Sequence, residues 1–485
     1  MTLITRREFV RRTAFAAALY GCPVEALAHA QRITDGHEQT AASLDSGAVR
    51  KFAAEITGHV ITTEAPDYEA ARVIFNRAFD LHPALIVRCG GASDVARSLD
   101  FAQKYNLPVA VRGGGHNRAG LSSCDGGVVI DLSTLNRVEV DPDKRVARAQ
   151  AGALVRDMDE ATQRFGLATT MGGCPTVGVA GLTLGGGEGL LMSKYGVASD
   201  NLRSAQLVTV NGRQVEASLN SNPDLFWAIR GGGGNFGVVT SLDYQLHPVT
   251  SVLAGTITYS PGRITELLQA FVKFVAAAPD EMNVVGVLLP SEQGARFHML
   301  VCHCGDPRIG NDLLNPMRAL KPLEDNVRVT SYLETQATIN PYTPVPHFQT
   351  DLFLPKFSDA VIETITSAIS SASENERVFI VPLYGAMSRV GVSETAYPLR
   401  QPGYEIDIMG RWNTPADKEN AVRWVKTLRD SLQPFANGVY ANQLGETSEA
   451  LVRAAYGANY HRLVEIKKKY DPNNVLRLNQ NIKPS

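Results

Sequence analysis

Two carboxylates separated by one residue, Glu405 and Asp407, lie in the segment GYEIDIMGRW at 403–412. The apolar residues around them predict a β-strand, in which residues two apart share a face. Neighbouring carboxylates oppose each other's ionisation, so one should have a raised pKa and could act as a base near neutral pH. Both could also lie on the solvent face of an antiparallel strand, and the spacing alone leaves the two interpretations open.

A lone cysteine, Cys174, stands between glycines and a proline in the segment MGGCPTVG at 171–178. A free cysteine often packs as a small buried hydrophobic residue. The thiol could instead bond to a ligand, and this segment alone does not distinguish the two.

Glycine is concentrated in one part of the chain, where 23 of the 42 glycines lie between Gly113 and Gly237. Glycine lets the backbone approach a ligand closely or adopt positive φ. The loops VRGGGHNRAG at 111–120 and GCPTVGVAGLTLGGGEG at 173–189 could offer backbone N–H groups to an anion, which predicts a phosphate-bearing cofactor. The same glycines could also serve tight turns.

A G-x-G-x-x-G pattern occurs at 232–237, with a helix-like segment before it and a strand-like segment after it. The dinucleotide-binding fingerprint requires the opposite order, so we expect no Rossmann site here.

Composition excludes several classes of protein. The 485 residues carry a net charge of −2, and the run of like charge at 467–469 is short, so no nucleic-acid-binding surface is expected. No apolar run is long enough to predict a membrane span. The CHC segment at 302–304 would place its cysteines and its histidine on opposite faces of a strand, so no metal site is expected.

The first thirty residues resemble a targeting segment. TRREFVR at 5–11 is similar to a twin-arginine signal, a short alanine-rich stretch follows, and Ala28-His29-Ala30 fits a cleavage site. These features predict export to the periplasm or medium, with the twin-arginine machinery as a partner. A basic amphipathic helix is the alternative interpretation.

The rest of the chain divides into three segments that differ in their pattern of predicted strands and helices. Residues 50–250 alternate short strands and helices, including a helix at 93–106 that Ser93 or Asp94 should cap, and predict an α+β domain. Residues 251–440 predict a second domain, an antiparallel sheet backed by helices. Residues 441–485 predict a helix followed by a polar segment.

Several motifs in order resemble one family. RGGGH, GCPTVGVAGLTLGGGEG, SKYGVASDN, DLFWAIRGGGGNFGVV and the late YDPNNVLRLNQNI are similar to berberine bridge enzyme-like flavin oxidases of the vanillyl-alcohol oxidase superfamily. The resemblance is strong over residues 80–250 and 445–482. It implies an α+β fold: a PCMH-type FAD-binding domain of two subdomains, a separate substrate domain, and a C-terminal segment that returns to the FAD-binding domain.

The resemblance also implies how FAD is held. His116 matches the histidine that bonds the flavin 8α-methyl carbon, and Cys174 matches the cysteine that bonds flavin C6, so FAD would be attached twice. For each residue the alternative is an ordinary loop or packing role. The other expected cofactor-binding residues are Arg112, Gly113, Gly114, Gly115, Asn117, Gly120, Val177, Gly178, Val179, Gly181, Gly185, Gly186, Gly187, Tyr195, Asp200, Asn201, Val239, Asn479 and Asn481.

Five residues are candidates for a catalytic role. By the resemblance, Asp407 matches a catalytic glutamate, which favours it over Glu405 as the base. Tyr440 lies in a segment where some members use a later tyrosine as the base, but Gln443 stands at that position and could only orient a hydroxyl. Glu188 is a further acid–base candidate or simply a turn residue.

The expected activity is that of an FAD-dependent oxidase. The substrate would be a small carbohydrate or secondary-metabolite alcohol that loses hydride from its C–OH carbon, and O₂ would become H₂O₂. Val177 matches a position where valine accompanies ready reaction with O₂. The alternatives are an amine oxidase of the hydroxynicotine type and a flavin-carrying binding protein without turnover.

Overall fold

A computed structural model describes residues 44–338 and 343–485. The expected targeting segment at 1–30 lies outside the described residues. The chain divides into two compact units, one up to Phe52 and one from Ala53 to Ser485. Helix α3 (Ser46–Glu55) belongs mostly to the first, and every feature below lies in the second.

The second unit begins with a small sheet in the order β1-β2-β4-β3, in which β2, β4 and β3 run parallel. Parallel strands need crossover connections, and a helix supplies the one between β2 and β3. The elements are β1 (His59–Thr62), α4 (Tyr68–Arg72), β2 (Leu85–Arg88), α5 (Ala92–Lys104), β3 (Val109–Arg112) and β4 (Val128–Asp131).

Helix α5 does not have the expected cap. Its N-cap is Gly91, without a side-chain hydrogen bond. The carboxylate of Asp94 instead accepts backbone N–H groups of Thr57, Gly58 and Gly90. The prediction of a Ser93 or Asp94 cap was therefore wrong, because Asp94 is used to fasten the preceding segments.

An antiparallel sheet in the order β5-β6-β10-β8-β9 follows, and a two-stranded pair β11-β7 lies apart from it. The segments between these strands form short helices that carry the second glycine loop. The elements are β5 (Val138–Asp141), β6 (Val146–Gln150), α6 (Val155–Gln163), β7 (Leu167–Ala168), α7 (Val179–Leu184), α8 (Met192–Tyr195), η1 (Ala198–Asn201), β8 (Leu202–Val208), β9 (Gln214–Ser218), α9 (Pro223–Ile229), β10 (Val238–Gln245) and β11 (His247–Pro248).

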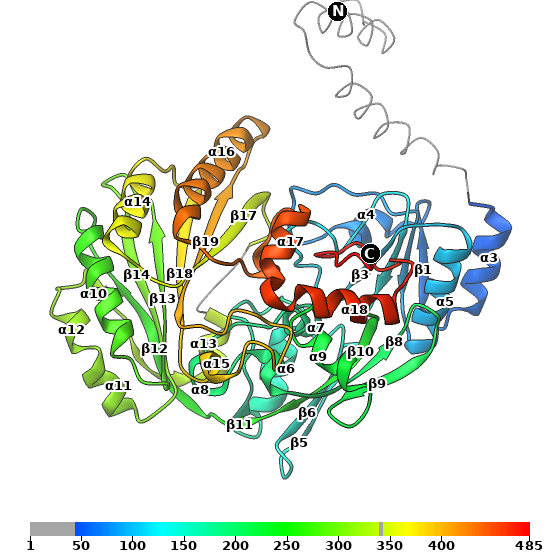
Figure 1. The fold of residues 1–485 in the computed structure, drawn as a ribbon, viewed down its shortest axis with the longest axis horizontal. Coiled ribbons are helices and arrows are strands. Elements are labelled where there is room, and N and C mark those ends of the chain that lie inside the picture. Colours follow the sequence, from blue (N-terminus) through cyan, green and yellow to red (C-terminus); the bar gives the residue numbers. More distant parts are fainter. Residues whose placement is uncertain (1–43, 339–342) are drawn as a thin grey trace, which may run out of the picture. The chain divides into compact units, whose positions relative to one another are not determined.

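The third sheet has eight antiparallel strands in the order β15-β12-β14-β13-β18-β19-β17, with β16 also paired to β12. Helices α10, α14 and α16 pack on one face of this sheet (Figure 1). The elements are β12 (Ser251–Thr258), α10 (Ile264–Ala276), β13 (Met282–Leu289), β14 (Arg296–His303), α11 (Pro307–Leu313), α12 (Asn315–Arg318), β15 (Glu324–Asp325), β16 (Arg328–Ser331), α13 (Tyr332–Thr338), β17 (His347–Leu354), α14 (Asp359–Ser370), β18 (Glu376–Leu383), α15 (Ala386–Arg389), β19 (Gly403–Arg411) and α16 (Pro415–Leu432).

The last segment returns to the first sheet through the tail that follows α18, and α18 itself packs against α9 (Figure 1). Leu478 packs against the core of that sheet, which includes Ile61, Ile86 and Val129. The elements are η2 (Gln433–Phe435), η3 (Ala441–Gln443), α17 (Glu449–Tyr456), η4 (Gly457–Asn459) and α18 (Tyr460–Tyr470).

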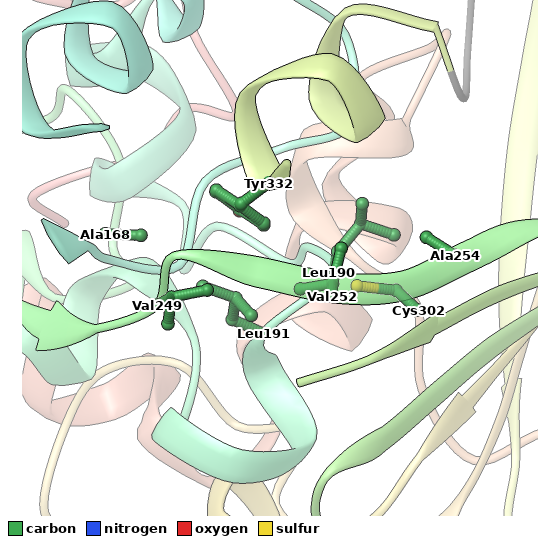
Figure 2. Packing of buried hydrophobic residues seen from close by; sticks show 8 residues of the cluster. All are labelled: Ala168, Leu190, Leu191, Val249, Val252, Ala254, Cys302 and Tyr332. Atoms are coloured by element: carbon green, nitrogen blue, oxygen red, sulfur yellow. The ribbon is translucent and has the colours of Figure 1, made fainter. Parts of the chain in front are cut away.

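A buried cluster joins the glycine-rich half to the large sheet. Leu190 and Leu191 from the glycine-rich half meet Val252, Cys302 and Tyr332 of the sheet and α13 (Figure 2). Burial of such side chains stabilises a contact by roughly 1.5–3 kcal/mol each. This packing fixes the position of the glycine loops against the face of the sheet that α10, α14 and α16 leave uncovered.

Candidate active site

A cavity of about 380 Å³ lies where the two glycine loops, the large sheet and the C-terminal segment meet. This volume falls in the usual range of small-molecule sites. We call its glycine-loop side, residues 113–118 and 172–178, the loop wall. We call its side formed by β13, β14, β18 and β19 the sheet wall.

The loop wall is built on direct contact between two backbones. A Cβ on Gly114 would lie 2.3 Å from the Gly178 nitrogen, and a Cβ on Gly178 would lie 2.3 Å from the Gly114 nitrogen. No side chain can occupy that space, so both positions require glycine. This backbone contact between Gly114 and Gly178, which we call the interlock, fixes the RGGGH and CPTVG segments relative to each other.

His116 and Cys174 meet the same hydroxyl on the loop wall. His116 Nε2 lies 3.0 Å from Thr176 Oγ1, and Cys174 Sγ lies 3.5 Å from it. His116 Nε2 and Cys174 Sγ are therefore no farther apart than the sum of these distances. The structure thus brings together two side chains that are 58 positions apart in the sequence.

The His116 ring is held as a neutral imidazole. It stacks on Phe75 with ring centroids 3.8 Å apart. Burial, aided by the positive charge of Arg118, lowers the pKa of His116 to about 3. Because Nε2 is directed at Thr176, Nδ1 is the ring nitrogen left for a bond to a ligand.

The C-terminal segment closes another side of the cavity. Lys467 is fully buried, and its Nζ donates to Asp471 Oδ2 and to the carbonyl oxygens of Asn235 and Leu476 at 2.7–2.9 Å. These bonds fix the segment that brings Asn479 and Gln480 to the cavity.

Unpaired polar atoms on the wall show that this cavity suits a polar cofactor. The Ser122 hydroxyl, the Asn479 amide oxygen and the Gln480 amide nitrogen are buried without hydrogen-bond partners among the described residues. Buried polar atoms are normally paired. Donors and acceptors beside a glycine-lined wall therefore fit a group with phosphate and hydroxyl oxygens, as expected of FAD.

Glu405 and Asp407 project from β19 into the cavity and are 0% and 4% exposed. The solvent-face alternative for this pair was therefore wrong. Burial raises the pKa of Asp407 to about 7, while Arg118 and a hydrogen bond from Gln349 oppose the rise. Burial raises the pKa of Glu405 further, well above its usual range, with Glu188 adding to the effect.

Glu188 also belongs to this acidic group. Its Oε1 accepts the Tyr397 hydroxyl at 2.6 Å, and burial raises its pKa. The proximity of Glu188 and Glu405 adds to the raised pKa of Glu405. Both carboxyls therefore hold their protons more strongly than usual, whereas the pKa of Asp407 is about 7.

Tyr440 supports the sheet wall from the C-terminal side. Its hydroxyl oxygen accepts the Gly187 N–H and the Asn442 side-chain amide, each at 2.9 Å, and its backbone N–H donates to Asp351. Burial raises the pKa of Tyr440 well above its usual range. The phenol therefore remains protonated, with its O–H left as a donor.

Sixteen of the predicted site residues line the cavity, and the other ten lie behind the residues that line it. Those on the cavity are Gly113, Gly114, Gly115, His116, Asn117, Cys174, Val177, Gly178, Gly181, Glu188, Val239, Glu405, Asp407, Tyr440, Gln443 and Asn479. Those behind it are Arg112, Gly120, Val179, Gly185, Gly186, Gly187, Tyr195, Asp200, Asn201 and Asn481.

Several of the ten have structural contacts that explain their residue type. Arg112 pairs with buried Asp131 at 2.8 Å, and Asp200 pairs with Arg400 at 2.6 Å. Tyr195 stacks on a histidine ring, and Gly186 makes room for the Tyr397 ring.

Sequence reasoning missed three residues that shape the site: Arg118, Thr176 and Gln349. Gln349 had a detectable signal, because HFQTDLFL at 347–354 alternates polar residues within an apolar strand. The rejected G-x-G-x-x-G segment lies between α9 and β10, which confirms the reversed order, yet Gly233, Gly234 and Gly237 line this cavity.

Within residues 44–338 and 343–485, no cluster of three or more histidine, cysteine, aspartate or glutamate side chains could hold a metal ion. Helices of the described segments are too short or too polar to cross a membrane.

The sequence is similar to those of known protein families and individual proteins. Residues 83–218 match the FAD binding domain family, and residues 439–483 match the family described as berberine and berberine like. An FAD-linked oxidoreductase of Bacillus subtilis is 31% identical over 441 residues, which cover 89% of this chain and 98% of the relative. The (R)-6-hydroxynicotine oxidase of Paenarthrobacter nicotinovorans is 30% identical over 448 residues, covering 88% and 97%.

Solved structures agree. The crystal structure of 6-hydroxy-D-nicotine oxidase from Arthrobacter nicotinovorans superposes with a TM-score of 0.83 at 30% identity, covering 89% of this chain and 98% of that one. Berberine bridge enzyme from Eschscholzia californica shares the fold, with a TM-score of 0.81 at 22% identity, covering 91% and 99%. The α+β fold with a PCMH-type FAD-binding domain is thus confirmed, and the chain belongs to the berberine bridge enzyme-like family of FAD-linked oxidoreductases.

Proposed function

We propose that this protein is an oxidase that removes hydride from a C–OH carbon of a small organic substrate, with Asp407 as the base. The observation that carries the proposal is a buried carboxyl on the cavity wall whose pKa is about 7. A base poised near neutral pH is what removal of a hydroxyl proton requires.

When bound, FAD would supply the acceptor for the hydride, with O₂ as the final oxidant that becomes H₂O₂. The substrate hydroxyl gives its proton to Asp407 Oδ1, which has no partner among the residues the structure describes. The carbon–oxygen bond becomes a carbonyl as the C–H bond breaks. Val177 on the loop wall supports reaction with O₂ through the resemblance given above.

We further propose that His116, through Nδ1, and Cys174, through Sγ, both attach FAD covalently. The contact that both side chains make with Thr176, through His116 Nε2 and Cys174 Sγ, supports this, because it holds the two side chains on one side of the cavity. The opposite side would then remain open for substrate at the sheet wall. Residues 1–30 are proposed to direct export, on the basis of their adjacent arginines.

Oxidation of a C–N bond is a second candidate, favoured by the 30% identity to (R)-6-hydroxynicotine oxidase. The test is anaerobic stopped-flow bleaching of the purified holoenzyme with a panel of alcohols, sugars and amines. Bleaching by alcohols or sugars supports the first candidate, and bleaching only by amines supports the second. A protein that neither bleaches nor forms peroxide with any compound would be a flavin carrier.

The same experiment tests the base. Asp407→Asn removes the proton acceptor, so we expect flavin reduction to slow by about 10²–10⁴-fold with the yellow colour retained. An unchanged reduction rate in Asp407→Asn would remove this residue from the base role.

Covalent attachment has its own test. Acid-precipitated wild-type protein should keep its flavin, whereas the His116→Ala/Cys174→Ala variant should release it.

A further inference from the structure

The side chain of Gln349 joins two groups that line the cavity. Gln349 is 1% exposed, and its amide nitrogen donates to Asp407 Oδ2 and to Gln443 Oε1, each at 2.8 Å. A side-chain amide nitrogen carries two hydrogens. Both are used here, so the orientation of the Gln349 amide is fixed by two acceptors at once.

The backbone of Gln349 is held as firmly as its side chain. On β17, Gln349 pairs with Met409 of β19, and Asp351 of the same face pairs with Asp407. The Gln349 carbonyl accepts the Gly445 N–H at 3.0 Å, and a Cβ on Gly445 would lie 2.4 Å from that carbonyl oxygen. Gln349 therefore supports two cavity-lining side chains from a strand that is bonded on one side to β19 and contacted by the C-terminal segment.

The second acceptor has two donors. Arg118 Nε, from the loop wall, donates to Gln443 Oε1 at 3.3 Å, the oxygen that Gln349 also uses. Because both bonds occupy the carbonyl oxygen, the Gln443 amide N–H groups remain available on the cavity side. Asp407 likewise uses Oδ2 for Gln349, and its Oδ1 has no partner within the described part of the chain.

The charges around Asp407 are few and come from several elements. Arg118 faces it from the loop wall and Asp351 from β17. Glu405 faces it from β19, and Glu188 from the glycine loop at 173–189. On β18 the residue opposite is Phe379, which does not titrate. Of the groups that favour the carboxylate, only Gln349 donates a hydrogen bond to it among the described residues.

We propose that Gln349 is a positioning residue for proton removal. It holds Asp407 Oδ2 and Gln443 Oε1 so that Asp407 Oδ1 and the Gln443 amide face the substrate together. An acceptor beside a donor matches a hydroxyl group, which gives its proton to Asp407 while its oxygen accepts from Gln443. This inference rests on the proposed function, in which Asp407 is the base.

The test is a pair of substitutions in the holoenzyme. Gln349→Met keeps the length of the side chain and removes the donor, and Gln349→Glu replaces the donor with an acceptor. The Gln349 hydrogen bond lowers the pKa of Asp407, so its loss should move the Asp407 midpoint upward by about one pH unit. Gln349→Glu should move it at least as far.

Two readouts follow the midpoint. Infrared difference spectra follow the carboxyl C=O band through a pH titration, with the Asp407 band identified by its loss in Asp407→Asn. Stopped-flow reduction by the fastest-bleaching compound of the panel gives the kinetic pH profile. Thr350→Val is the matched control, because Thr350 lies on the opposite face of the same strand.

The outcomes distinguish failure of the role proposed for Gln349 from failure of the role proposed for Asp407. A purely structural role for Gln349 would lower the reduction rate equally at every pH and leave the infrared midpoint unchanged, which would overturn the inference. In the Asp407→Asn background, Gln349→Met should produce no further pH shift. If Asp407→Asn reduces flavin normally, the proposed base itself is wrong.

Discussion

The loop wall and the sheet wall enclose the same cavity but are made of different groups. The loop wall consists of glycine backbone with two reactive side chains, His116 and Cys174. The sheet wall presents carboxyls from a rigid antiparallel sheet, Glu405 and Asp407. The loop wall can approach a flat ring closely, and the sheet wall can hold or accept protons. Cofactor retention and proton transfer should therefore respond to different substitutions.

The largest expected effect is on the loop wall. In Gly114→Ala the new methyl group would lie 2.3 Å from the Gly178 nitrogen, so the two loops must separate. We expect loss of bound flavin, measured as the ratio of visible to ultraviolet absorbance. Gly91→Ala is the control, because a Cβ there meets nothing within 4 Å. Normal flavin content in Gly114→Ala would show that the interlock is not required.

A smaller effect is expected from the buried cation that supports the C-terminal side. Lys467→Met removes three hydrogen bonds and leaves Asp471 buried without its cation. Breaking such a pair costs about 3–5 kcal/mol. Denaturant unfolding should show this loss, and Lys468→Met, at an exposed neighbour that pairs with Glu465, should show little change. Equal stability of the two variants would contradict this role.

The smallest effect concerns the sheet wall and depends on pH. Burial raises the pKa of Glu405, so above about pH 4.3 the folded protein keeps a proton that the unfolded chain releases. Stability should therefore fall as pH rises. Glu405→Gln removes this titration and should make the fall shallower, by up to about 1.4 kcal/mol per pH unit. Melting temperatures from pH 5 to 8 test this.

Exposed Glu324→Gln serves as the comparison for that series. If the melting curves of wild type and Glu405→Gln shift in parallel with pH, the folded protein does not hold the Glu405 proton more strongly than the unfolded chain, and the raised pKa of Glu405 is wrong.

The sequence predicted what depends on local pattern. Alternation along β19 was enough to place Glu405 and Asp407 on one face, and the concentration of glycine was enough to mark both loops that line the cavity. Gln349 was not predicted, because its hydrogen bond to Asp407 depends on the register of β17 against β19, which the sequence of β17 does not specify. The cap of α5 failed for a similar reason, because Asp94 bonds to amides 36 and 37 positions away.

The return of the C-terminal segment has a consequence for biosynthesis. Arg118 and Gln443, which share a hydrogen bond, are 325 positions apart. A nascent polypeptide on the ribosome therefore exposes the RGGGH loop long before its counterpart emerges. The cavity wall is complete only after translation has passed Gln480, and a fragment that stops earlier lacks part of the wall that encloses the cofactor.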